Sequence, residues 1–256
     1  AVWQIYGAAF GDLLGTAREN EGPGAVDGPE PEGTDSYGRP RTRPIEGAQI
    51  YRSDDGGENW TKLGGGLPGS GDDEGGLIGK IGLAISPQDP DVLYAAIELD
   101  RRKGAVYRSG DRGASWEKRS ETVSGGTGPH YYQEIYASPH SDGRVYQMDV
   151  FIHVTRDGGE NWEDVTPSDL PPEGRVQTID PSPHQAGKAY FAVYRYLLGD
   201  YAPYIYRTTD YGRTWTPIFD DAPTGSVGDL AVSPSHPNVL YVGTGEGLHR
   251  PDLAVG

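Results

Sequence analysis

The chain has no cysteine among its 256 residues, and it has no run of eighteen or more apolar residues. Without thiols there can be no disulfide framework, no thiolate metal site and no cysteine nucleophile. Without a long apolar run, the sequence predicts no membrane-spanning helix, and we expect no membrane insertion.

Positive charge is also scarce, because 22 Lys and Arg residues stand against 38 Asp and Glu residues and give a formal net charge of -16. Such a chain repels phosphate backbones and anionic lipids, so we expect no nucleic-acid partner and no membrane-surface binding. The six histidines have no paired ligand spacing, so the sequence predicts no metal site of the zinc type and no cofactor.

Turn-forming and aromatic residues are abundant. The chain contains 39 Gly and 21 Pro, together with 17 Tyr and 5 Trp. Gly and Pro end strands and form turns, whereas aromatic residues suit half-buried pleated surfaces. This composition predicts an all-β protein with many short strands.

One eight-residue pattern occurs four times: Ser or Thr, any residue, Asp, any residue, Gly, two further residues and Trp. The copies are Ser53, Asp55, Gly57 and Trp60, then Ser109, Asp111, Gly113 and Trp116, then Thr155, Asp157, Gly159 and Trp162, and finally Thr208, Asp210, Gly212 and Trp215. The tryptophans recur after 56, 46 and 53 residues, close to the length of a four-stranded propeller blade.

Each copy lies between two β-type runs, so we interpret it as a hairpin turn, called an Asp-box. Its Asp can accept hydrogen bonds from backbone N–H groups of the turn, and its Gly can adopt a positive φ. The Ser or Thr hydroxyl can close the loop, and the Trp can pack beneath it.

A second repeat, a strand ended by a Ser-Pro turn, precedes a further apolar strand. Its copies start at Ile81, Glu134, Val176 and Val227. One unit is therefore strand, Ser-Pro turn, strand, loop, strand, Asp-box and strand, which predicts β-propeller blades of four antiparallel strands.

The number of blades depends on the two ends of the sequence. The first box has no Ser-Pro strand before it, and the last Ser-Pro unit has no box after it. One possibility is that the two ends pair in one blade and close a ring of four. The other is that residues 2–6 form the second strand of their own unit, which gives a fifth, partial blade.

We expect residues 1–256 to form a single propeller domain or a fragment of a larger propeller. Residues 11–46 are acidic, rich in Gly and Pro and without periodicity, which predicts a long loop insertion. The abrupt ends of the sequence favour a processed chain or an excised fragment.

The four boxes resemble those of the BNR-repeat propeller superfamily. Residues 79–87 and 203–215 further resemble large bacterial sortilin-like (VPS10-type) and xyloglucanase-like exoproteins, and the similarity covers most of residues 48–250. The resemblance implies a propeller in an exported protein, extracellular or periplasmic, with the remainder of a larger propeller as a partner. It implies activity only weakly, because unrelated functions share this structural turn.

A sialidase-like site would need an arginine cluster. Arg52, Arg108 and Arg207 occupy equivalent repeat positions before the boxes, which indicates a structural role for them. A calcium site is suggested only by composition, at Asp54, Asp55 and Gly57 and at residues 72–74.

A xyloglucanase-like site would need two carboxylates that flank the bond to be cleaved. Eight acidic residues near predicted strand ends are available for it: Asp12, Glu98, Asp100, Glu134, Asp149, Asp180, Asp229 and Glu246. None of them stands out enough to be assigned as catalytic.

Aromatic residues near strand starts and loops are the better indication of a ligand. Tyr131, Tyr132, Tyr194 and Tyr196 could stack on sugar faces or anchor a peptide. Two functions stay open. The first is a binding or scaffold propeller that recognises carbohydrate or a protein segment through its loops, and the second is a glycoside hydrolase, or part of one, that uses two loop carboxylates.

Overall fold

A computed structural model describes residues 2–5, 49–68, 81–100, 103–121, 134–148, 151–172, 174–195, 198–219 and 225–245. The predicted insertion at residues 11–46 lies outside these ranges. The described chain is all-β, as the composition predicted, and none of its residues belongs to a helix able to cross a membrane.

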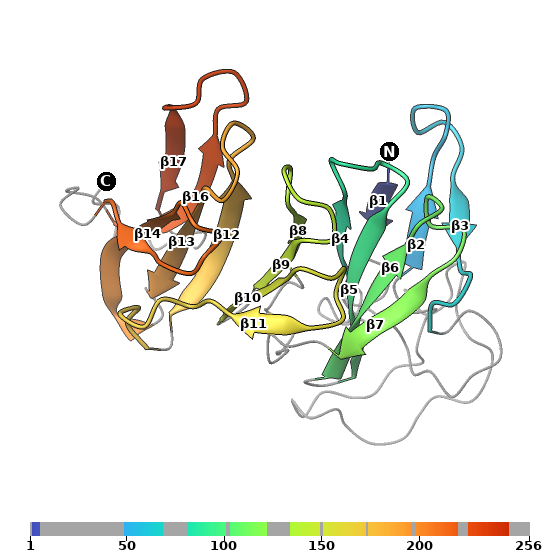
Figure 1. Cartoon of the computed structure of the whole chain (residues 1–256), viewed down its shortest axis with the longest axis horizontal. Helices are drawn as coiled ribbons and strands as arrows, with labels where there is room; N and C mark the ends of the chain where they lie inside the picture. Colours follow the sequence, from blue (N-terminus) through green and yellow to red (C-terminus); the bar gives the residue numbers. More distant parts are fainter. Residues whose placement is uncertain are drawn as a thin grey trace, which may run out of the picture.

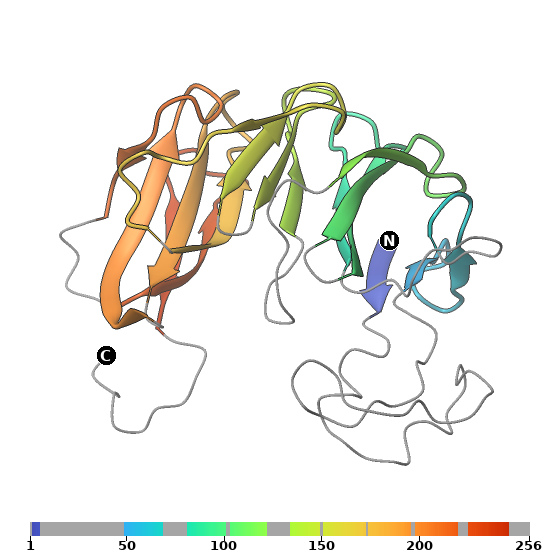
Figure 2. The same cartoon turned by 90° about the horizontal axis from the view of Figure 1, so that it is seen from below.

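The described strands form five antiparallel sheets in chain order, and the three central sheets have four strands each. These are β4 (Ile81–Ile85), β5 (Leu93–Asp100), β6 (Lys103–Ser109) and β7 (Glu117–Glu121), then β8 (Glu134–Ala137), β9 (Val145–Met148), β10 (Ile152–Thr155) and β11 (Trp162–Asp164), and then β12 (Arg175–Pro181), β13 (Ala189–Arg195), β14 (Asp200–Thr208) and β15 (Thr216–Pro217). The sheets follow one another along an arc (Figure 2), so the predicted four-stranded propeller blades are confirmed.

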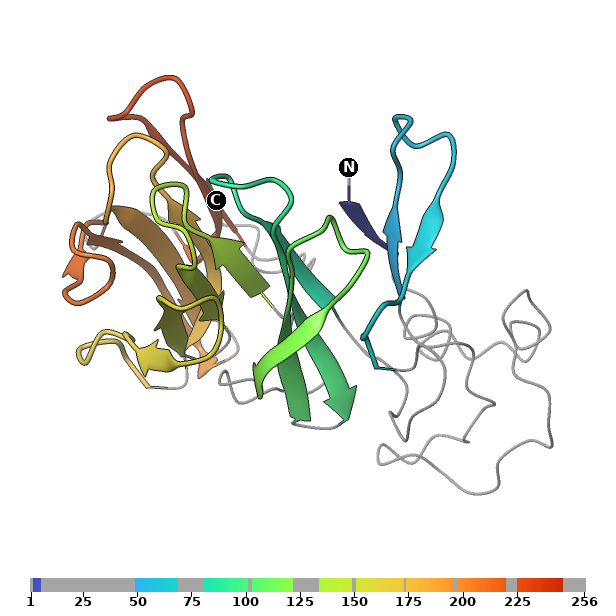
Figure 3. The same cartoon turned by 45° about the vertical axis from the view of Figure 1, so that its right-hand side comes forward.

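The terminal sheets are smaller. The first contains β1 (Val2–Ile5), β2 (Gln49–Arg52) and β3 (Thr61–Leu63), and the last contains β16 (Val227–Val232) and β17 (Leu240–Thr244). Figures 1 and 3 place these two sheets at opposite ends of the series.

The described strands do not join the two ends of the chain in one blade. Strand β1 pairs with β2, with Val2 opposite Arg52, and so occupies the edge of β2 that β17 would need. The structure therefore has the second predicted arrangement, with a partial fifth sheet.

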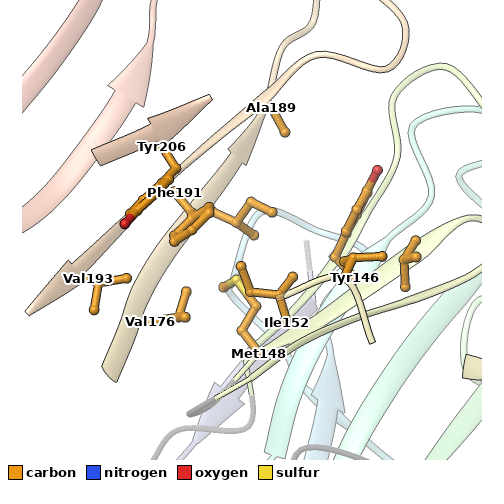
Figure 4. Close-up of a cluster of buried hydrophobic side chains, with 11 residues drawn as sticks. Tyr146, Met148, Ile152, Val176, Ala189, Phe191, Val193 and Tyr206 are labelled. Atoms are coloured by element: carbon orange, nitrogen blue, oxygen red, sulfur yellow. The ribbon is translucent and has the colours of Figure 1, made fainter. Parts of the chain in front are cut away.

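The hydrophobic core lies between neighbouring sheets rather than at one centre. Four separate clusters of buried side chains fill the four junctions between the five sheets. At the junction of the third and fourth sheets, Met148 and Ile152 face Val176 and Phe191 (Figure 4). Phe191 also stacks on Tyr206 with ring centroids 4.9 Å apart.

All four Asp-boxes share the hydrogen bonds of their hydroxyl and carboxylate, whereas the indole of Trp215 in the fourth donates to the Val165 carbonyl rather than to the glycine of its own box. In the second, the Ser109 hydroxyl donates to Asp111 Oδ1 at 2.8 Å and accepts the Gly113 N–H at 2.8 Å, while Asp111 Oδ1 accepts the Ser115 N–H at 2.8 Å. Gly113 has φ +83°, a value that favours glycine. Ser or Thr opens the box because either side chain supplies the required hydroxyl.

Three of the four Ser-Pro turns are also bonded to the next sheet. Gln88 Nε2 donates to the Pro139 carbonyl at 2.5 Å, His140 Nε2 lies 2.8 Å from the Ser182 carbonyl, and His184 Nε2 lies 2.8 Å from the Ser233 carbonyl. At three successive junctions, the side chain that directly follows the Ser-Pro pair thus forms a hydrogen bond to a backbone carbonyl of the next sheet.

Candidate functional site

One end of the sheets is occupied by structural turns. In antiparallel blades the Asp-box and the Ser-Pro turn lie at the same end, and here they bond to each other. The Arg112 N–H donates to the Asp91 carbonyl at 2.9 Å, and the Gly158 N–H donates to the Gly143 carbonyl at 2.8 Å. A ligand-binding site is therefore to be sought at the opposite end of the sheets and on their innermost strands.

A layer of polar side chains lies on the innermost strands, four residues before the serine of each Ser-Pro turn. The residues at this position are Gly82, Glu134, Thr178 and Asp229. Two residues later, on the same side of each strand, lie Ala84, Tyr136, Asp180 and Ala231. Strands β8, β12 and β16 thus carry three carboxyl groups, Glu134 and Asp229 at the first of these positions and Asp180 at the second, and we refer to the two positions together as the layer.

Hydrogen bonds connect members of this layer. The Tyr136 hydroxyl donates to Glu134 Oε2 at 3.2 Å, and Thr178 of the next sheet is hydrogen-bonded to Tyr136. Asp180 Oδ2 accepts the Val232 N–H at 2.7 Å across the following junction. The Glu134 carboxyl group is therefore bonded to a side chain of its own strand. The Asp180 carboxyl group is instead bonded to a backbone N–H of the next sheet, so it connects two sheets.

The electrostatics of the three carboxyl groups differ. Burial raises the pKa of Glu134, hydrogen bonding from Tyr136 opposes this, and the charge of Asp229 raises the pKa further. Burial likewise raises the pKa of Asp180, with the same contribution from Asp229. Asp229 itself is exposed to solvent. One solvent-exposed carboxyl group thus lies in the same layer as two carboxyl groups whose pKa values are raised by burial.

This arrangement allows two kinds of chemistry. Carboxylates and a tyrosine hydroxyl can accept or donate hydrogen bonds to the hydroxyl groups of a sugar. Glycoside hydrolysis also requires two carboxyl groups, one as proton donor and one as base or nucleophile, and a raised pKa suits the proton donor. In the described ranges, no group of three His, Asp or Glu side chains could hold a metal ion.

The predicted ligand-binding tyrosines are mostly not placed. Tyr131, Tyr132 and Tyr196 lie outside the described residues, and Tyr194 is half-buried near the end of β13, opposite Arg175 of β12. They stay predictions.

Exposed apolar side chains do occur at the tip of the β13–β14 hairpin, at the end of the sheets away from the boxes. Tyr201 is 42% exposed and Leu198 is 49% exposed. Asp200 accepts a hydrogen bond from the Tyr204 hydroxyl at 2.8 Å and pairs with Arg195, which also donates to the Pro172 carbonyl at 2.9 Å. The ion pair fixes the hairpin tip, and Tyr201 is available beside it for stacking.

The other sequence candidates lie elsewhere in the described chain or outside the described residues. Asp12, Asp149 and Glu246 lie outside the described residues, and Glu98 and Asp100 lie towards the end of β5, next to the β5–β6 hairpin. Arg52 donates to the Arg112 carbonyl at 3.1 Å, at the Asp-box end of the sheets. The carboxylate of Asp55 is bonded within its own box to Ser53 and Asn59.

Sequence reasoning named the three carboxyl residues of the layer but did not group them, and it missed Tyr136 and Thr178. Counting back from each Ser-Pro turn would have found all five, because the turn fixes the position of every residue on the innermost strand.

Comparisons with known proteins give one family match and several partial relatives. The family Sortilin-Vps10, described as "Sortilin, neurotensin receptor 3", matches residues 104–242, and the BNR/Asp-box repeat matches residues 51–62. A xyloglucanase from Paenibacillus sp is 29% identical over 202 residues, which are 68% of this chain and 19% of that protein. A probable oligoxyloglucan-reducing end-specific xyloglucanase from Neosartorya fischeri is 25% identical over 197 residues, which are 62% of this chain and 23% of that protein.

Solved structures share the fold. The GH74 xyloglucanase from Xanthomonas campestris has a TM-score of 0.54 at 21% identity, and the GH74 enzyme from Niastella koreensis has 0.57 at 19%. The alignments cover 73% and 76% of this chain but 30% of each enzyme. The chain therefore spans about a fifth of the length of the curated relatives that it matches, and its relationship is to glycoside-hydrolase-like Asp-box propellers.

Proposed function

We propose, from the premise that this chain belongs to the Sortilin-Vps10 family of Asp-box propellers, that it forms part of an exported carbohydrate-binding propeller protein. The ligand would contact the layer of Glu134, Tyr136, Thr178 and Asp229 on the innermost strands. The convergence of these side chains from three consecutive sheets is the observation that carries the proposal.

The chemistry of the layer favours an uncharged polysaccharide. Two of these four side chains are carboxyl groups and the other two are hydroxyl groups, so each can hydrogen-bond sugar hydroxyls. The net charge of -16 disfavours sulfated or uronic-acid glycans. The relatives named xyloglucanases support a glucan of the xyloglucan type, and Tyr201 would supply a stacking surface at the same end of the sheets. An exported location, extracellular or periplasmic, fits such a ligand.

Calorimetric titration with xyloglucan oligosaccharides tests this proposal. Asp229→Asn and Glu134→Gln keep the side-chain shape but replace one carboxyl oxygen by an amide nitrogen, and we expect each to weaken binding by about tenfold, because each removes a hydrogen-bond acceptor for sugar hydroxyls, worth about 0.5–3 kcal/mol. Glu163→Gln, on outer strand β11, is the matched control, since its carboxylate pairs only with exposed Arg156 in the described contacts. Equal affinity of all three variants and the unaltered chain would refute a site on the innermost strands.

A second candidate function is glycoside hydrolysis, favoured by the raised pKa of Glu134 next to exposed Asp229. Glu134 would donate a proton to the leaving oxygen, and Asp229 would act as base or nucleophile. Asp180 suits the acid role less well, because one of its oxygens already accepts the Val232 N–H.

Release of reducing ends from xyloglucan distinguishes the two functions. Binding without release supports the binding protein alone. Release that falls by at least about a hundredfold in Glu134→Gln, and that declines as pH rises through the raised pKa of Glu134, supports hydrolysis. Release that persists in both Glu134→Gln and Asp229→Asn would exclude these residues as the catalytic pair.

A further inference from the structure

Tyr136 differs from the residues at its repeat position on the other innermost strands. Two residues before the serine of each Ser-Pro turn lie Ala84, Tyr136, Asp180 and Ala231, so Tyr136 is the only aromatic residue among them. Its ring packs against the apolar cluster between the third and fourth sheets, which Figure 4 shows. Because the hydroxyl lies at the end of a rigid ring, this packing also fixes the place of the hydroxyl.

Two hydrogen bonds of defined direction meet at this hydroxyl. Tyr136 donates to Glu134 Oε2 at 3.2 Å, and Thr178 of the fourth sheet is hydrogen-bonded to Tyr136. A tyrosine hydroxyl has one proton, and Glu134 receives it, so Thr178 donates to the Tyr136 oxygen. Thr178 is itself buried. The three side chains form a relay that runs from Thr178 through Tyr136 to Glu134 and crosses the junction between two sheets.

The relay keeps its direction at neutral pH, because Tyr136 keeps its proton. Burial and the neighbouring charge of Glu134 both raise the pKa of Tyr136. As a donor, Tyr136 stabilises the ionised form of Glu134. Burial raises the pKa of Glu134, and the hydrogen bond from Tyr136 opposes that rise.

One of the two carboxyl oxygens of Glu134 is used by the relay. Oε2 accepts the Tyr136 hydroxyl, whereas the described contacts contain no hydrogen bond or ion pair to Oε1. Glu134 is partly exposed. Oε1 is therefore the oxygen that remains for a ligand.

We propose that Tyr136 and Thr178 are positioning residues, which hold Glu134 by Oε2 so that Oε1 accepts a hydrogen bond from a hydroxyl group of the bound sugar. The inference rests on the proposed carbohydrate site and adds how its central carboxyl group is oriented.

The relay has two consequences for the site. Thr178 belongs to the fourth sheet and Glu134 to the third, so the orientation of the ligand-contacting oxygen depends on the junction between these sheets. If the site hydrolyses glycosides, the proton to be donated would be carried on Oε1, since Oε2 is engaged by Tyr136. The same positioning therefore serves binding and hydrolysis.

The pKa of Glu134, measured in the full chain by carbon NMR spectroscopy of its carboxyl group, tests the relay without any ligand. Tyr136→Phe keeps the ring and its packing but removes the hydroxyl, so the pKa of Glu134 should rise, because its ionised form loses a hydrogen bond. Thr178→Val should cause a smaller rise, whereas Thr178→Ser, which keeps a hydroxyl, should cause none. Tyr107→Phe, on β6 of the second sheet, is the control and should also leave this pKa unchanged. An unchanged pKa in Tyr136→Phe would overturn the relay.

Calorimetric titration with xyloglucan oligosaccharides tests the effect on the ligand. Tyr136→Phe should weaken binding about threefold or more, but should have no further effect in the Glu134→Ala background, because it acts through that side chain. Thr178→Ser should bind as the unaltered chain does. Losses that add in the double variant would contradict the positioning role. If the unaltered chain binds no oligosaccharide, the proposed function fails, whereas a raised pKa of Glu134 in Tyr136→Phe would still support the relay, so the two failures are distinguishable.

Discussion

Replacement of Ser109 by alanine tests whether the box hydroxyl stabilises the hairpin as the geometry indicates. Ser109 is 1% exposed, and its hydroxyl accepts the N–H groups of Gly113 at 2.8 Å and Asp111 at 3.3 Å. Ser109→Ala leaves the Gly113 N–H in a buried site without this acceptor, which costs about 1–3 kcal/mol. For a chain of this length, the Tm should fall by about 2–12 °C.

The chain supplies its own control for this experiment. Thr155 and Thr208 occupy the same position in other boxes, and their hydroxyls accept the N–H groups of Gly159 and Gly212 at 3.1 and 2.9 Å. Ser109→Thr should therefore cost less than about 1 kcal/mol. Thermal and denaturant unfolding, followed by circular dichroism, would measure both variants. If Ser109→Thr were as destabilising as Ser109→Ala, or if neither changed stability, the hydroxyl would not have the role assigned to it.

Three further predictions concern stability. Gly66→Ala should destabilise the chain by more than about 2 kcal/mol in urea unfolding, because Gly66 has φ +98° and an added Cβ would lie 2.3 Å from the Trp116 carbonyl oxygen; Gly56→Ala, with φ +79° and open space, should cost only about 1 kcal/mol. Hydrogen bonds from Ser115 and Ser109 lower the pKa of Asp111 to about 2, so its contribution should be intact above about pH 4 and lost as pH falls towards 2; Asp111→Asn should abolish that part of an acid titration. Since burial raises the pKa of Glu134, folding is most favoured while this group is protonated, and Glu134→Gln should raise the Tm relative to the unaltered chain at pH 7 but not at pH 4.

The Asp-box spacing was enough to predict the strand–turn–strand units, because its hydroxyl, carboxylate and glycine must meet within one turn. The Ser-Pro repeat likewise predicted strands such as β4 and β16. The arrangement at the ends could not be predicted, since residues 2–6 and 239–243 both have the pattern of a second strand. Only the pairing of β1 with β2 distinguishes the two arrangements.

The candidate site was predictable only in part. The sequence could not distinguish Glu134, Asp180 and Asp229 from five other acidic candidates, because their grouping depends on how three sheets are placed around the arc. Tyr241 illustrates the same limit, since it is exposed although its repeat position matches that of buried Tyr94. Burial at such positions depends on neighbouring sheets, which a local pattern does not contain.

The hydrogen bonds that run from Gln88, His140 and His184 to the following turn have an evolutionary consequence. The donor side chain is glutamine at the first of these junctions and histidine at the next two, but the acceptor is always a backbone carbonyl, which every sequence provides. A repeat can therefore be duplicated or lost by recombination while the junctions on either side keep their chemistry. Proteins built in this way can vary in size one repeat at a time.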